Sequence, residues 1–137
     1  MKIFIDNNIM LDAFLARQPF NEAAEQILTA CAETHKVCLS ANSLTDIFYF
    51  LRKLTSAATA KAAIRKSMEL FEIIPVNEED CQSALSLPID DFEDALVVIC
   101  AKKANADYIV TRDKEFLQIH SPIPTISPDD LLNLLDM

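Results

Sequence analysis

Short, almost wholly apolar segments recur along this chain and alternate with longer segments of helical periodicity. We predict strands at residues 2–5, 37–41, 72–76, 107–110 and 123–126. Strands that are apolar on both sides have to be covered on both faces, and the intervening helices supply that cover. The sequence therefore predicts an α/β fold, a three-layer α/β/α arrangement around a central, mostly parallel sheet of four to five strands.

Apolar residues at helical spacing mark the segments between the strands. We predict helices at residues 7–16, 21–33, 43–54, 57–71, 78–87, 92–104 and 128–135. Asn21 is the expected N-cap of the second helix, and Ser127 followed by Pro128 is a typical start for the last one. The 92–104 helix is apolar almost all round, so we expect it to be buried. Pro124 marks the last strand as an edge strand.

The composition is that of an ordinary globular chain, with 51% hydrophobic and 24% charged residues among 137. A chain of this length predicts a single domain, residues 1–137. No apolar run reaches the roughly 18 residues of a membrane span, and the N-terminus resembles a strand rather than a signal peptide. We expect a cytoplasmic location and no membrane partner.

Glycine is absent from the sequence. This excludes the glycine-rich phosphate loops of P-loop and dinucleotide-binding proteins. Left-handed turns must then use residues such as Asn, and Asn105 is the clearest candidate for a helix C-cap. The four cysteines show no CxxC spacing and lie in apolar contexts, which is typical of buried free thiols. With only two histidines, any metal would be bound by oxygen.

Four acidic residues lie at or near the expected junctions between strands and helices. Asp6 directly follows the first strand, and Asp113 comes three residues after the strand that ends at Val110. Asp46 falls in the expected first turn of its helix, and Asp94 lies at the start of the buried helix. Ligands of open parallel sheets bind at the carboxyl ends of the strands. We therefore expect these four carboxylates to meet in one cleft.

Each acid also has a local structural explanation. Ser43 and Asp46 have the spacing of a helix cap, and Asp94 lies in a first turn, where the helix dipole favours anions. Asp113 could N-cap a short helix, and Asp6 could end its strand in an Asx-turn.

Gathered on one rim, however, the carboxylates would repel one another. Two of them about 4 Å apart repel by roughly 4 kcal/mol at an effective dielectric near 20. A divalent cation removes that repulsion, and all-oxygen ligation suits Mg²⁺ or Mn²⁺. Such an ion can activate a water for attack on phosphorus. This predicts phosphodiester hydrolysis.

The motifs FIDNN, LTDIFYFLRK, FEDAL and ADYIVTRDKEF resemble, in order and spacing, those of the PIN-domain ribonucleases over nearly the whole chain. The resemblance implies that Asp6, Asp46, Asp94 and Asp113 bind one or two Mg²⁺ or Mn²⁺ ions. It places Asn8 and Thr111 in supporting polar positions. Chains of this size look like VapC-type toxins, which implies an RNA target, a homodimer and a small inhibitory antitoxin.

One position departs from the family pattern. The second acid is commonly Glu in the family, whereas here it is Asp46, one methylene shorter. We therefore expect Asp46 to reach the metal directly or through a water. Glu93, adjacent to Asp94, is an alternative ligand.

The formal net charge of −9 argues against a nucleic-acid partner, but the charge is unevenly distributed. No acid occurs between residues 52 and 68, where five basic residues are found. This basic strip is either a solvated helix face or a phosphate-binding surface: Arg52, Lys53, Lys61, Arg65 and Lys66.

Two other functions remain open. A catalytically weak PIN-like binding or assembly module would suit the acidic charge. A haloacid-dehalogenase-like phosphatase would need a second Asp two residues after Asp6, where this chain has Asn8.

Overall fold

The computed structural model describes residues 1–136; Met137, the last residue of the predicted domain, lies outside them. Its sheet has five strands in the order β3-β2-β1-β4-β5, and all neighbouring pairs are parallel. The strands are β1 (Lys2–Ile5), β2 (Lys36–Ser40), β3 (Glu72–Ile74), β4 (Tyr108–Val110) and β5 (Thr125–Ile126). The predicted parallel sheet is confirmed, and β5 is an edge strand as Pro124 indicated.

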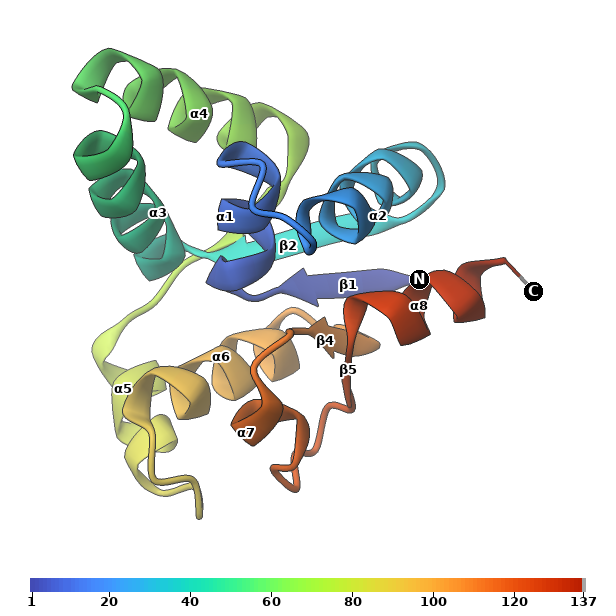
Figure 1. The fold of residues 1–137 in the computed structure, drawn as a ribbon. Coiled ribbons are helices and arrows are strands. Elements are labelled where there is room, and N and C mark those ends of the chain that lie inside the picture. Colours follow the sequence, from blue (N-terminus) through green and yellow to red (C-terminus); the bar gives the residue numbers. More distant parts are fainter. Residues whose placement is uncertain (137) are drawn as a thin grey trace.

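Helices cover both faces of this sheet (Figure 1). One face carries α1 (Asn7–Phe14), α2 (Asn21–Thr34), α3 (Ala41–Leu54), α4 (Ala57–Leu70) and α8 (Pro128–Leu135). The other carries α5 (Glu78–Leu85), α6 (Phe92–Lys103) and α7 (Lys114–Leu117). The predicted three-layer α/β/α architecture is confirmed. None of the helices described in residues 1–136 is both long and apolar enough to cross a membrane.

The strands contribute to two separate hydrophobic cores because successive side chains point to opposite faces. In β1, Ile3 and Ile5 pack under α1, α2 and α3, whereas Phe4 packs against α6 on the opposite face. All three are fully buried. This explains why β1 is apolar at every position. The α6 helix is buried along most of its length, as its all-round apolar sequence predicted.

The caps of two helices differ from those predicted. Phe20, not Asn21, is the N-cap of α2, and it makes no side-chain capping bond. Helix α3 begins at Ala41, directly after β2, with Ser40 as its N-cap. Asp46 therefore lies beyond the first turn, and the expected capping pair with Ser43 is wrong. Ser43 is instead hydrogen-bonded to the Ser40 hydroxyl at 2.9 Å.

Among residues 1–136, two adopt left-handed backbone conformations: Ala16 (φ 49°) and Asn105 (φ 57°). The C-cap of α6 is Ala104 rather than Asn105; Asn105 follows it and adopts the predicted left-handed conformation. Ser127 caps α8 and Pro128 opens it, also as predicted. The left-handed conformation of Ala16, which follows α1, was not expected.

The cysteines within residues 1–136 are all free thiols, and three of them, Cys31, Cys38 and Cys100, are buried. Burial raises the pKa of the Cys38 thiol to about 12. The prediction of buried, unpaired cysteines therefore holds, except that Cys81 is only partly buried.

Candidate active site

The four predicted carboxylates line one cavity of about 590 Å³ at the carboxyl edge of the sheet. From β1 the chain adds β2 and β3 on one side of the sheet and later β4 and β5 on the other, so β1 lies between β2 and β4. This is the topological switch point at which parallel sheets leave a crevice. The cavity is lined by Asp6, Asn7, Asn8, Leu11, Arg17, Asp46, Tyr49, Phe50, Asp91, Glu93, Asp94 and Asp113. The structure thus brings the predicted acids together.

Asp6 is held in the floor of this cavity by Thr111, which directly follows β4, and by the first residues of α1. The fully buried Thr111 hydroxyl donates to Asp6 Oδ2 at 2.8 Å. Asn8 Nδ2 donates to the same oxygen at 3.3 Å and to the Thr111 hydroxyl at 3.2 Å. The Asn7 backbone N–H donates to Asp6 Oδ1 at 2.8 Å, so Asp6 also caps α1. Asn8 and Thr111, the two polar residues that the family resemblance singled out, are therefore both hydrogen-bonded to Asp6.

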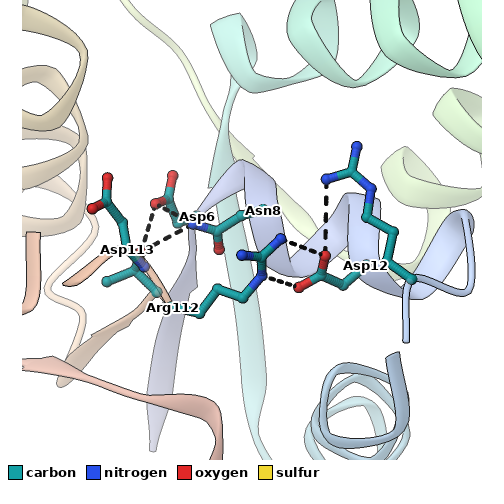
Figure 2. Close-up of polar contacts among 7 residues, drawn as sticks. Asp6, Asn8, Asp12, Arg112 and Asp113 are labelled. Carbon is teal, nitrogen blue, oxygen red and sulfur yellow. Dashed lines mark hydrogen bonds and ion pairs between the residues drawn. The ribbon is translucent and has the colours of Figure 1, made fainter. Parts of the chain in front are cut away.

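Asp113 enters the site from the loop between β4 and α7. Its backbone N–H donates to the Thr111 hydroxyl at 3.1 Å, and its carboxylate caps α7 by accepting from the Glu115 N–H at 3.0 Å. Figure 2 shows the carboxylates of Asp6 and Asp113 pointing to the same side. The local capping role and the place in the cavity are compatible.

Asn7 connects the acids of α3 and α6. Its Nδ2 donates to Asp46 Oδ2 at 3.0 Å and, more distantly, to Glu93 Oε1 at 3.4 Å. Asp46 therefore reaches the cavity despite its shorter side chain, from the second turn of α3. Glu93 lies on the exposed rim.

Asp94 lies in the first turn of α6, whose N-cap is Asp91. The Asp91 carboxylate accepts from the Asp94 N–H at 3.0 Å. Both side chains line the cavity, so α6 contributes a carboxylate that the four-acid prediction did not contain.

Crowding and burial raise the pKa values of several of these carboxylates. The pKa of Asp94 is raised to about 7, first by burial and then by the charges of Asp91, Asp6 and Asp113. Burial also raises the pKa of Asp6, against the opposing effect of the Thr111 hydrogen bond. Glu93 has a raised pKa because of partial desolvation and the nearby charge of Asp46. Binding of a proton or a cation in this cavity is therefore favourable.

The donor set fits a hard divalent cation. The anionic groups that could bind a metal are all carboxylates among the described residues. The amide oxygens of Asn7 and Asn8 are buried without a hydrogen-bond partner within residues 1–136. Such oxygens can accept hydrogen bonds from the waters that Mg²⁺ retains. As the side chains stand, however, no three His, Cys, Asp or Glu residues among those described form a ready ligand group. A shared ion would therefore require these carboxylates to approach one another more closely.

Several cavity residues were not predicted from the sequence. Asp91 directly precedes the expected start of its helix, so its capping position could have been recognised. Asn7 adjoins Asp6 in the FIDNN motif. Tyr49 and Phe50 are exposed on α3, and Arg17 follows α1. Nothing in the periodicity of the sequence distinguishes these three residues, because their place depends on how the helices pack.

The basic strip lies outside the cavity. Arg52 and Lys53 are in the last turn of α3, and Lys61, Arg65 and Lys66 are on α4. All five are exposed, and within residues 1–136 none forms an ion pair. Their exposure is compatible with a solvated helix face and with a phosphate-binding surface.

Comparisons with known proteins agree with this architecture. A model of the PIN domain family matches residues 2–115. The chain is 28% identical over 121 residues to Ribonuclease VapC1 from Aquifex aeolicus (strain VF5), covering 84% of this chain and 83% of that protein.

Solved structures share the fold. A chain of a toxin-antitoxin complex from Klebsiella pneumoniae superposes with a TM-score of 0.70 at 21% identity, over 92% of this chain and 97% of that one. Mycobacterium tuberculosis VapC20, a Sarcin-Ricin loop cleaving toxin, gives a TM-score of 0.69 at 16% identity, over 83% and 92% of the two chains. Since the family model spans most of the sequence and all four predicted acids, this chain belongs to the PIN domain family.

Proposed function

We propose that this protein is an Mg²⁺- or Mn²⁺-dependent endoribonuclease that hydrolyses RNA phosphodiester bonds. The observation that carries the proposal is the convergence of Asp6, Asp46, Asp94 and Asp113, from four separate segments, on one cavity. The similarity to Ribonuclease VapC1 supports nuclease activity.

The residues have distinct roles in this proposal. Asp6, Asp94 and Asp113 would hold the metal, with Asp46 bound directly or through a water and Glu93 as an alternative ligand. When bound, the ion supplies an activated water and stabilises charge on the leaving oxygen. Thr111 and Asn8 keep Asp6 oriented through their hydrogen bonds. The amide oxygens of Asn7 and Asn8, which lack a partner among the described residues, can orient water.

Turnover of single-stranded RNA in Mn²⁺ tests the proposal. Asp6→Asn preserves the size of the side chain and removes its charge, so cleavage should fall by about a hundredfold or more. Glu25→Gln removes an exposed carboxylate from α2, outside the cavity, and should cleave like wild type. Chelation by EDTA should stop cleavage by both active proteins. Equal rates for wild type and Asp6→Asn would indicate a contaminating nuclease and refute the proposal.

We further propose that this enzyme is the toxin of a toxin–antitoxin pair and forms a homodimer in the cytoplasm. Support comes from structural neighbours that are VapBC or toxin-antitoxin complexes. Six carboxylates line the cavity, so an inhibitory segment should be basic. An oligopeptide rich in arginine should inhibit cleavage, and light scattering should give twice the chain mass. A monomer would refute the dimer.

A catalytically weak binding module is the second candidate. It is favoured by the net charge of −9 and by the lack, within residues 1–136, of a ready ligand group. RNA binding without cleavage in either metal would support it. The phosphatase alternative loses support because Asn8, not an acid, faces Asp6. The family model that matches the chain is also that of the PIN domain.

A further inference from the structure

Arg17 is the only basic residue among the cavity-lining residues in the described part of the chain. Six carboxylates share the same walls. A phosphodiester entering this space would meet negative charge on almost every side, which strongly disfavours its approach. The arginine already in the cavity therefore bears directly on how a polyanion could enter.

The guanidinium of Arg17 is largely free to bind a ligand. Its contact with a charged group is to the buried Asp12, at 3.9 Å, which is longer than a hydrogen bond. Arg112 already occupies both oxygens of Asp12, through bonds of 2.6 Å from Nε and 3.0 Å from Nη2. Figure 2 shows the Arg112 guanidinium against the Asp12 carboxylate. Asp12 is therefore neutralised without Arg17.

Arg112 cannot take the same role in the cavity. Besides binding Asp12 with two donors, its guanidinium lies over the Phe20 ring, 4.0 Å from the centroid. It does not line the cavity. The two arginines therefore differ: Arg112 fixes the position of Asp12, and Asp12 in turn attracts Arg17 without consuming its donors.

The backbone before Arg17 is held in an unfavourable conformation. Ala16 has φ 49°, a region that residues with a Cβ seldom adopt. The turn brings the Arg17 N–H to the Asp12 carbonyl at 3.1 Å, so the chain folds back over the end of α1. Backbone strain of this kind is concentrated at functional sites. Here it places the Arg17 side chain at the cavity.

From these observations we infer that Arg17 binds a phosphate of the RNA strand at the acid cavity, which deepens the proposed ribonuclease function and rests on it. The planar guanidinium can present two parallel N–H groups to two phosphate oxygens. It offsets the carboxylate field where the strand enters. Arg17 is thus a substrate-binding residue of this site.

Binding and cleavage have to be measured separately to test the assignment. Binding of a labelled single-stranded RNA is followed by fluorescence anisotropy with Ca²⁺ in place of Mg²⁺, across a range of salt concentrations. The proteins are wild type, Arg17→Gln, Arg17→Lys and, as a matched control, Lys36→Gln, which removes one exposed cation far from the cavity. Thermal melting of each protein is recorded, and cleavage is measured in Mn²⁺.

We expect Arg17→Gln to weaken binding about tenfold or more, the effect of losing a charged hydrogen bond. The slope of log K against log salt should fall by about 0.7, the value for one phosphate bound on a single strand. Arg17→Lys should keep the slope but bind less tightly, because a lysine ammonium cannot present two parallel N–H groups to the phosphate. Lys36→Gln should match wild type. Melting should change little, because Asp12 keeps both bonds from Arg112.

Other results overturn the assignment. Lower melting temperatures with an unchanged salt slope, or loss of folding in both Arg17 variants, would mean that Arg17 serves only to support Asp12. If wild type cleaves RNA and Arg17→Gln binds RNA as tightly as wild type, the phosphate contact of Arg17 is refuted and the nuclease proposal stands. If wild type binds but does not cleave, while the slope still falls in Arg17→Gln, the nuclease proposal fails and the phosphate contact stands. Absence of both binding and cleavage refutes both.

Discussion

The Thr111 hydroxyl donates a 2.8 Å hydrogen bond to Asp6 Oδ2 across the boundary between β4 and β1. The same hydroxyl accepts the Asp113 N–H at 3.1 Å. Because Thr111 is fully buried, this hydroxyl fixes the Asp6 carboxylate relative to the backbone of Asp113. Residues that are 105 positions apart are thereby held in register at the floor of the cavity.

Replacing this hydroxyl with a methyl group should destabilise the fold. Thr111→Val keeps the volume but leaves Asp6 without its buried donor, which should lower the free energy of unfolding by about 1.5–3 kcal/mol. Urea denaturation at neutral pH measures the change. Thr111→Ser retains the hydroxyl and should lose less. Equal losses in the two variants would show that packing, not the hydrogen bond, accounts for the effect.

The pKa of Asp94 predicts how stability depends on pH. In the folded chain it is raised from 3.8 to about 7. Between these values the folded state holds a proton that the unfolded state has released, so the free energy of unfolding should fall as pH rises from about 4 to 7. Urea denaturation across this range, with EDTA present, measures it. Asp94→Asn should flatten the fall, whereas Glu25→Gln should retain it.

Divalent metal should stabilise the fold. At ten times the dissociation constant, bound Mn²⁺ or Mg²⁺ adds about 1.4 kcal/mol to the free energy of unfolding, or a few degrees in melting temperature. Differential scanning fluorimetry measures the shift. Asp6→Asn should reduce it and Glu25→Gln should not. An equal shift in all three proteins would place the bound metal elsewhere on this acidic surface.

The left-handed backbone at Ala16 predicts a stabilising substitution. A residue with a Cβ pays about 1–2 kcal/mol for φ 49°, whereas glycine adopts it without strain but loses more entropy on folding. Ala16→Gly should therefore raise the free energy of unfolding by about 0.5–1 kcal/mol in urea denaturation. Asn105→Gly, at φ 57°, is the matched control and should gain less, because Asn tolerates this region.

The basic strip on α3 and α4 predicts a salt-dependent effect on RNA binding. If it binds phosphates, changing Lys61, Arg65 and Lys66 together to Ala should weaken RNA binding. The salt slope should also fall, by about 0.7 for each phosphate that the strip no longer neutralises. Fluorescence anisotropy at several salt concentrations measures both quantities. An unchanged slope would assign the strip to a solvated helix face.

The sequence by itself determined the architecture and the four acids. Apolar strands such as Lys2–Ile5 can only be buried between two layers of helices, and an acid that follows such a strand has to lie at the edge of the sheet. The same reasoning identified the buried α6 helix and the left-handed Asn105. These features depend on local periodicity and backbone preference, which a single sequence displays.

Only the tertiary structure decided which polar groups meet. Asn7 bonds to Asp46 across 39 positions of sequence, and Arg112 bonds to Asp12 across 100. Arg17 reaches the cavity because of one left-handed residue and a carboxylate already bound by another arginine. Such contacts join segments that lie far apart in the sequence. Their geometry is set by packing of the whole chain, and no local pattern of residues encodes it.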